Sequence, residues 1–106
     1  SNIVVGNATQ PTITVVSPNG GEIWHNNAER QRITWRSSGV DWVKVDLLGT
    51  RYGLAAHWPA AQGYVDINVP SDLNSSDEYY IRISDEAGRV YDDSNAPFTI
   101  TSATSI

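Results

Sequence analysis

The stretch Trp42-Val43-Lys44-Val45-Asp46-Leu47-Leu48 is the clearest β-strand in the sequence. Its aliphatic residues at 43, 45 and 47 alternate with an aromatic residue at 42 and charged residues at 44 and 46. Successive side chains of a strand point to opposite faces, so one face of this segment is predicted to enter a hydrophobic core. The other face carries a large aromatic beside charged neighbours, and we expect it to meet water.

The same alternation recurs on both sides of this strand. The inward residues predicted there are Ile33 and Trp35 in segment 31–36, Val65, Ile67 and Val69 in segment 63–69, and Tyr79, Ile81 and Ile83 in segment 79–84. Further short strands are predicted at 12–16, 22–24, 89–91 and 97–101, and a short edge strand with a loop at 51–58. About seven to eight strands without a convincing helix predict an all-β fold, an immunoglobulin-like Greek-key β-sandwich.

Turn residues separate the strands. The run 17–21, Ser-Pro-Asn-Gly-Gly, combines a fixed proline φ with glycines that accept positive φ. Residues 85–88 are predicted to form a hairpin tip, with Gly88 in the left-handed conformation. Tyr79, near the start of its strand, is a candidate tyrosine corner.

A chain of 106 residues is long enough for one domain, and such a domain buries about two-thirds of its unfolded surface. We assign residues 1–11 to a linker or N-terminal arm, 12–101 to the sandwich, and 102–106 to a Ser/Thr linker. Cysteine is absent, which excludes disulfides, thiolate zinc sites and thiol chemistry.

The net charge of −5 argues against a nucleic-acid partner, which would require a basic stripe. The basic residues of the chain are scattered along the sequence, apart from Arg30, Arg32 and Arg36. No apolar run approaches the roughly 20 residues of a membrane span, so no membrane insertion is expected. No signal peptide is recognisable either, as expected of a module excised from a longer secreted protein.

The run ITVVSPNGGEIW at 13–24 resembles the opening I-x-V-x-x-P-N-G-G-E-x-W of the yeast cell-wall synthesis Kre9/Knh1-like domains. These immunoglobulin-like modules are also called Ser-Thr-rich GPI-anchored membrane domains. The similarity continues through 32–39, 69–71, 79–83, 92–94 and 97–100, so that it covers about residues 12–101. The first motif is fairly specific, whereas the later pieces are generic sandwich strands.

The resemblance implies a secreted β-sandwich of the kind found in fungal wall proteins and appended to bacterial and archaeal extracellular enzymes. It brings no catalytic residues, and it implies that Trp24 and Trp35 are core residues. Four aromatics depart from the family pattern, in which small or polar residues are commoner: Trp42, Trp58, Tyr64 and Tyr80. We expect any individual function to lie with these four.

A carbohydrate platform is the first candidate site. If strand 42–48 pairs with strand 79–84, as in standard sandwich topology, their outward residues form one surface. That surface consists of Trp42, Lys44, Tyr80 and Arg82. Aromatic rings stack on pyranose C–H faces, and the two cations could pair with uronate or sulfate groups. In the alternative, Trp42 packs over an edge and Arg82 pairs with Asp46.

The sequence pattern supports the other candidate sites less strongly. Tyr52, His57, Trp58 and Tyr64 are either a rim site or a lid closing one end of the sandwich. Asp85, Glu86, Asp92 and Asp93 flank one hairpin, where they are either a calcium site or an acidic guard of a sheet edge. The only histidines are His25 and His57, and no nucleophile elbow is present, so we predict no enzyme activity and no cofactor.

The sequence therefore predicts a non-catalytic accessory module of an extracellular multidomain protein. Its expected partners are a polysaccharide and the covalently linked catalytic or surface domains of the parent chain. Trp42, Lys44, Tyr80 and Arg82 are the first binding residues, and Trp58 and Tyr64 the second. Two alternatives stay open: a structural spacer or wall-interaction domain without sugar affinity, and a protein-binding adhesin that uses the same aromatic face.

Overall fold

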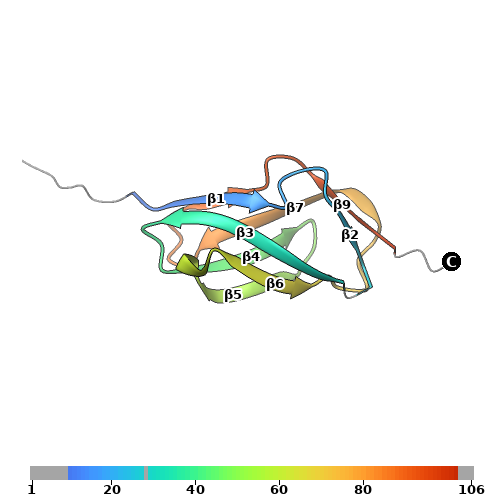
Figure 1. Ribbon diagram of the computed structural model, residues 1–106, viewed down its shortest axis with the longest axis horizontal. Helices are drawn as coiled ribbons and strands as arrows, with labels where there is room; N and C mark the ends of the chain where they lie inside the picture. The colour runs from blue at the N-terminus through green and yellow to red at the C-terminus, as the bar shows by residue number, and fades with distance from the viewer. Residues whose placement is uncertain (1–9, 28, 103–106) are drawn as a thin grey trace, which may run out of the picture.

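A computed structural model describes residues 10–27 and 29–102 of the chain (Figure 1). The strands are β1 (Thr12–Ser17), β2 (Ile23–His25), β3 (Arg30–Ser38), β4 (Trp42–Leu48), β5 (Gly53–Pro59), β6 (Tyr64–Asn68), β7 (Ser76–Asp85), β8 (Tyr91–Asp93) and β9 (Phe98–Thr101). One 3-10 helix, η2 (Ala60–Gln62), lies between β5 and β6. Most of the predicted N-terminal arm and C-terminal linker lies outside the described residues.

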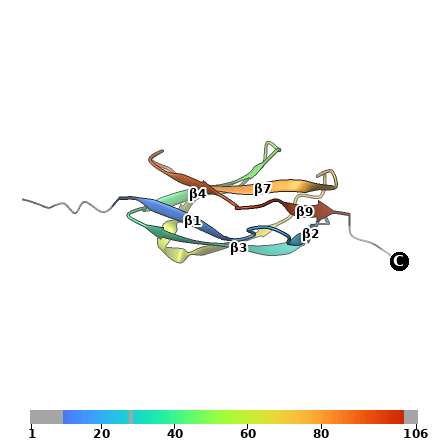
Figure 2. The same cartoon turned by 90° about the horizontal axis from the view of Figure 1, so that it is seen from above.

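The strands form two sheets, and Figure 2 shows them as two layers. The smaller sheet has the order β1-β3-β6, and the larger has the order β2-β9-β7-β4-β5 with β8 beside β7. All pairs are antiparallel except β2 with β9. The predicted all-β sandwich is confirmed, and its connections cross between the sheets as in immunoglobulin-like domains.

The core lies between the sheets and consists of the predicted inward rows. Val43, Val45 and Leu47 are at most 1% exposed, and burying each side chain contributes roughly 1.5–3 kcal/mol. Trp24 and Trp35 are also buried, as predicted. The indole Nε1 of Trp35 donates to the carbonyl of Ala60 at 3.0 Å, which satisfies its polar group inside the core.

The predicted turn features are present. Gly20 and Gly21 have φ of 141° and 84°, and Gly88 has φ of 82°. The Tyr79 hydroxyl donates to the carbonyl of Asn74 at 2.6 Å, which confirms the tyrosine corner. Burial raises the pKa of this phenol, so it remains a donor.

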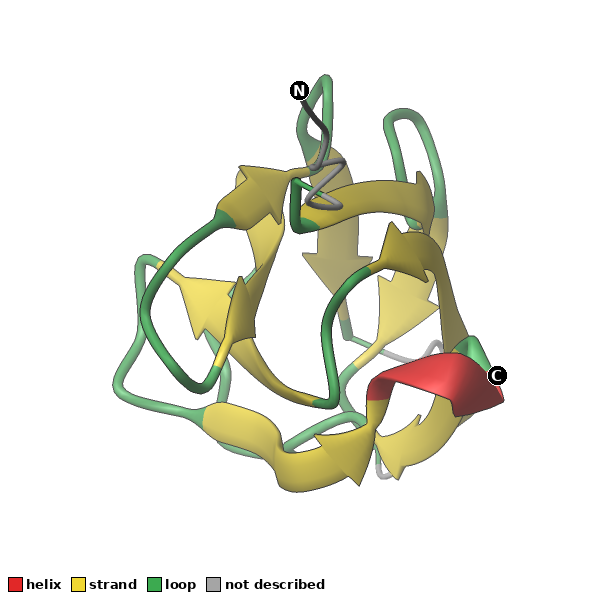
Figure 3. Cartoon of the chain, turned by 90° about the vertical axis from the view of Figure 1, so that its left-hand side faces the viewer, coloured by secondary structure: helices red, strands yellow, loops and turns green. Residues whose placement is uncertain are grey.

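Segment 51–58 differs in part from its prediction. The predicted edge strand is present as β5, which has seven residues, lies at the edge of the larger sheet and runs one residue past the segment. It continues directly into η2, a helical turn that the sequence pattern did not predict. Gly63 ends η2 with φ of 77° and donates its N–H to the Ala60 carbonyl. Seen end-on, the strands surround the core and η2 lies at the rim (Figure 3).

Candidate functional site

The pairing of β4 with β7 places the predicted residues on the outer face of the larger sheet. Lys44 lies opposite Ser84, Asp46 opposite Arg82, and Leu48 opposite Tyr80. Because Val43, Val45 and Leu47 point into the core, these partners point away from it. Trp42, Lys44, Tyr80 and Arg82 therefore share one sheet face, as the sequence predicted.

Trp42 is 41% exposed and lies flat against a second ring. Its indole stacks on the imidazole of His57, with ring centroids 4.0 Å apart and planes inclined by 13°. The stack covers one face of the indole, so Trp42 is neither packed under the sandwich nor freely standing on it.

His57 is held in place by its backbone and by Glu86. Its φ of 52° is unusual for a residue with a Cβ, and such strain persists only where surrounding contacts impose it. The His57 N–H donates to Glu86 Oε2 at 2.6 Å, and His57 Nδ1 lies 2.8 Å from Oε1. A carboxylate only accepts hydrogen bonds, so Nδ1 carries the proton, and the His57 side chain as a whole is 66% exposed.

Glu86 also connects His57 to the backbone of Trp42. Its backbone N–H donates to the Trp42 carbonyl at 3.0 Å. The hydrogen bond from His57 lowers the pKa of the Glu86 carboxyl, so it is ionised at neutral pH. We call Trp42, His57 and Glu86 the aromatic cluster. Three separate elements, β4, β5 and the β7–β8 turn, fix its geometry.

The sequence pattern does not bring the members of this cluster together. It groups His57 with Trp58 and assigns Glu86 to an acidic hairpin. Strand β5 does pair with β4, but irregularities in the register between Val43 and Val45 and between Val45 and Asp46 displace its residues. Gly53 lies at the irregularity between Val45 and Asp46. Neither the irregularity beside His57 nor the positive φ of His57 is marked by a glycine, so no sequence signal identifies the stack.

Arg82 has a partner that the sequence did not predict. Its Nε and NH2 groups donate to the Asp93 carboxylate at 2.7 and 3.1 Å, in place of the suggested pair with Asp46. Its guanidinium also lies 4.2 Å from the ring centre of Tyr91, which is 57% exposed. Since these guanidinium N–H groups already bind Asp93, Arg82 is a poor receptor for an acidic sugar. Tyr91 is an exposed aromatic that the sequence pattern did not single out.

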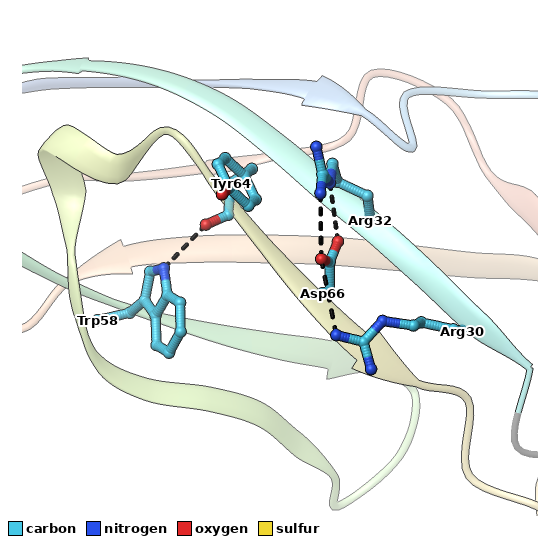
Figure 4. A network of polar contacts seen from close by, with 5 residues as sticks. All are labelled: Arg30, Arg32, Trp58, Tyr64 and Asp66. Carbon is cyan, nitrogen blue, oxygen red and sulfur yellow. Dashed lines mark hydrogen bonds and ion pairs between the residues drawn. The ribbon is translucent and has the colours of Figure 1, made fainter.

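Trp58 and Tyr64 belong to other surroundings. Trp58 is partly buried against the core, and its Nε1 donates to the Tyr64 carbonyl at 2.8 Å (Figure 4). The Tyr64 ring lies under the guanidinium of Arg32, 4.1 Å from its centre, on the smaller sheet. Tyr52 bonds to Asp72. The four predicted rim residues therefore do not form one site, and the packing of Trp58 is that of a lid.

The four acidic residues near the β7–β8 hairpin each have a different partner. Asp85 binds Arg89, Glu86 binds His57, Asp93 binds Arg82, and Asp92 accepts the N–H of Val15 at 2.8 Å. That last bond covers a backbone donor on the edge strand β1, which fits the role of edge guard. Within residues 10–27 and 29–102, no three His, Asp or Glu side chains converge as metal ligands.

The outer face of the larger sheet is open and slightly acidic. No pocket opens among the described residues. The outward charges of β4 and β7, together with the carboxylates bonded to His57 and Arg82, are two bases, Lys44 and Arg82, and three carboxylates, Asp46, Glu86 and Asp93. In addition, the described part of the chain has no helix long and apolar enough to cross a membrane.

Comparison with known proteins returns no match: no family model, no curated protein and no solved structure is significantly similar to this chain. The resemblance to the Kre9/Knh1-like domains therefore rests on the sequence motifs alone, and the side chains of the site are the basis for assigning a function.

Proposed function

We propose that this domain is a non-catalytic accessory module of an extracellular multidomain protein, and that it binds a polysaccharide at the aromatic cluster. The observation that carries the proposal is the exposed, parallel stack of Trp42 on His57, held by two hydrogen bonds from His57 to Glu86. A rigid aromatic face binds the C–H face of a sugar ring with little loss of side-chain entropy. His57 Nε2 beside it can bond a sugar hydroxyl.

The shape of the surface favours a polymer over a small molecule. Small ligands are usually enclosed in a pocket, whereas a flat face can accept a chain that runs across it. Tyr91 extends the aromatic surface: it lies beside Ser84, which lies beside Lys44. Two strand spacings and two residues along β4 separate Tyr91 from Trp42, about 12 Å between Cα atoms. Two such contacts, on separate sugars of one chain, bind the chain more strongly than either contact alone.

The charges of the surface favour a neutral polysaccharide. Arg82 is neutralised by Asp93, and Lys44 lies close enough to Glu86 to contribute to its lowered pKa. An acidic polymer would meet more carboxylates than free cations on this face, and like charges repel it. Lys44 is instead a hydrogen-bond donor for hydroxyls beside the stack.

Affinity electrophoresis against soluble neutral polysaccharides tests the proposal. We expect at least one glucan, mannan or xylan to retard the domain, and Trp42→Ala and His57→Ala each to abolish the retardation. Ile23→Ala is the matched control, because Ile23 is 60% exposed on the same sheet but outside the cluster. Absence of retardation across the panel, or loss of retardation in the control as well, would refute the proposal.

A structural spacer is the second candidate. The first described strand begins at one end of the sandwich, and β9 ends at the other (Figure 1). This arrangement allows domains to be joined end to end with little bending. A spacer shows no retardation with any polysaccharide, which separates the two candidates.

A further inference from the structure

The two sheets carry opposite charge. The strands of the smaller sheet contain three arginines and one aspartate, for a formal charge of +2. The strands of the larger sheet contain two bases and six carboxylates, for a formal charge of −4 with histidines neutral. The whole chain has a net charge of −5, so the charge of the smaller sheet is opposite in sign to that of the chain.

All three arginines point outward from β3. Ile33 and Trp35 are buried, so the alternate residues Arg30, Arg32 and Arg36 lie on the opposite face of the strand. Arg30 and Arg32 have side chains 71% and 57% exposed. Arg36 is exposed as well, and no ion pair joins it to another residue of the described chain.

One carboxylate is shared by two of these arginines (Figure 4). Arg32 donates to both Asp66 oxygens, at 2.8 and 3.1 Å, and Arg30 lies 3.7 Å from the same group. The contact with Arg32 is a bidentate guanidinium–carboxylate bond on an open sheet surface. It shows the geometry that this face offers to a carboxylate. Because one aspartate cannot neutralise two arginines, the face keeps an excess of positive charge at Arg30 and at Arg36.

From these observations we infer that the outer face of the β1-β3-β6 sheet is a second binding site, which takes a carboxylate-bearing polysaccharide such as a polyuronate. Arg36 and Arg30 bind its carboxylates, and the site is independent of the aromatic cluster on the other sheet. Arg30 and Arg36 are six residues apart on one strand, about 20 Å. An extended polymer can contact both, whereas a single sugar cannot.

The neighbours of the arginines suit sugar hydroxyls. Thr14 lies opposite Arg36 in β1, and Thr34 lies between Arg32 and Arg36 on the same face. A nucleic acid fits this face less well, because bases need free aromatic surfaces, and Tyr64 is half-buried with its ring under Arg32, whereas Tyr91 on the other sheet is exposed. Nucleic acid also carries one charge per about 1.7 Å of duplex, which the acidic remainder of the domain repels. A polyuronate carries one charge per sugar.

Titration calorimetry with polygalacturonate tests the inference, in about 0.1 M salt, where the screening length of about 10 Å matches the distance between the sheets. We expect saturable binding that weakens as salt is raised. Arg36→Gln should weaken it about fivefold, as should Arg30→Gln. Lys44→Gln removes the same charge from the opposite face and should change the affinity by less than about twofold. Arg32 is left intact because it holds Asp66 and Tyr64.

Three further measurements distinguish this site from the aromatic cluster and from a general attraction of polyanions. Trp42→Ala should leave polygalacturonate binding intact, so failure of the aromatic site and failure of this one can be told apart. Dextran sulfate and a single-stranded oligonucleotide should both bind more weakly than polygalacturonate. Absence of polygalacturonate binding, equal losses in Arg36→Gln and Lys44→Gln, or tighter binding of either of the other polymers would overturn the inference.

Discussion

Trp42→Ala should destabilise the domain by a moderate and calculable amount. A buried tryptophan covers about 250 Å², and Trp42 is 41% exposed, so about 150 Å² of it is shielded in the fold. At about 25 cal/mol per Å² this is worth at most about 4 kcal/mol. Alanine retains part of that burial, and the unfolded chain already shields some of it, so we expect a loss of about 1.5–2.5 kcal/mol.

Urea unfolding followed by tryptophan fluorescence and far-UV circular dichroism measures this loss. For a domain of this size it corresponds to a fall in melting temperature of about 10 °C. A double-mutant cycle with His57→Ala isolates the stack itself. Because an aromatic pair adds about 0.5–1.5 kcal/mol beyond burial, the coupling free energy of the cycle should lie in that range.

Two results would contradict this expectation. A loss below about 0.5 kcal/mol with no coupling to His57 would mean that the indole stands free of the imidazole, because an exposed side chain contributes little to stability. A loss above about 4 kcal/mol would place Trp42 in the core, as expected for fully buried aromatics. The expected intermediate value also sets the conditions for the binding assay, which must be run well below the melting temperature of the variant.

Other perturbations test the fold. Tyr79→Phe deletes the hydroxyl bonded to Asn74 and should lower the free energy of unfolding by about 1 kcal/mol, whereas Tyr80→Phe should be nearly neutral. Gly20→Ala would bring a new Cβ to 2.7 Å from the Cβ of Ala96 at a φ of 141° and should lower the melting temperature by more than about 5 °C; an unchanged value would show that the turn has room for a side chain. The hydrogen bond from Arg89 lowers the pKa of Asp85, so its stabilising effect is complete above the ordinary carboxyl pKa of about 4 and is lost as pH falls through the lower folded value. Melting temperature should therefore decline below about pH 4, and less steeply in Asp85→Asn; identical melting at pH 7 and pH 2.5 would be inconsistent with this.

Much of the candidate surface could be predicted from the sequence. The alternation in Trp42–Leu48 and in segment 79–84 places Trp42, Lys44, Tyr80 and Arg82 on one face, since a two-residue period and antiparallel pairing suffice for that. The partners of these residues could not be predicted. Arg82 lies within reach of carboxylates on two neighbouring strands, and the choice of Asp93 over Asp46 depends on side-chain geometry.

The contacts within the aromatic cluster are even harder to predict from the sequence. Trp42, His57 and Glu86 come from three elements, and their contact depends on a register irregularity and on a backbone angle that no glycine marks. Tyr91 is not among the predicted site residues. Its strand is only three residues long, which is too short to show an alternation of apolar and polar residues.

Local residue patterns are enough to specify the sandwich, its inward rows, the tyrosine corner and the glycine turns. These features follow from local rules: side chains alternate along a strand, and glycine alone accepts positive φ without cost. Only the assembled fold makes Trp42 stack on His57, pairs Arg82 with Asp93 and divides the charge between the two sheets. Those outcomes depend on which residues meet across strands distant in the chain, and the register that brings them together is set by the packing of the whole domain.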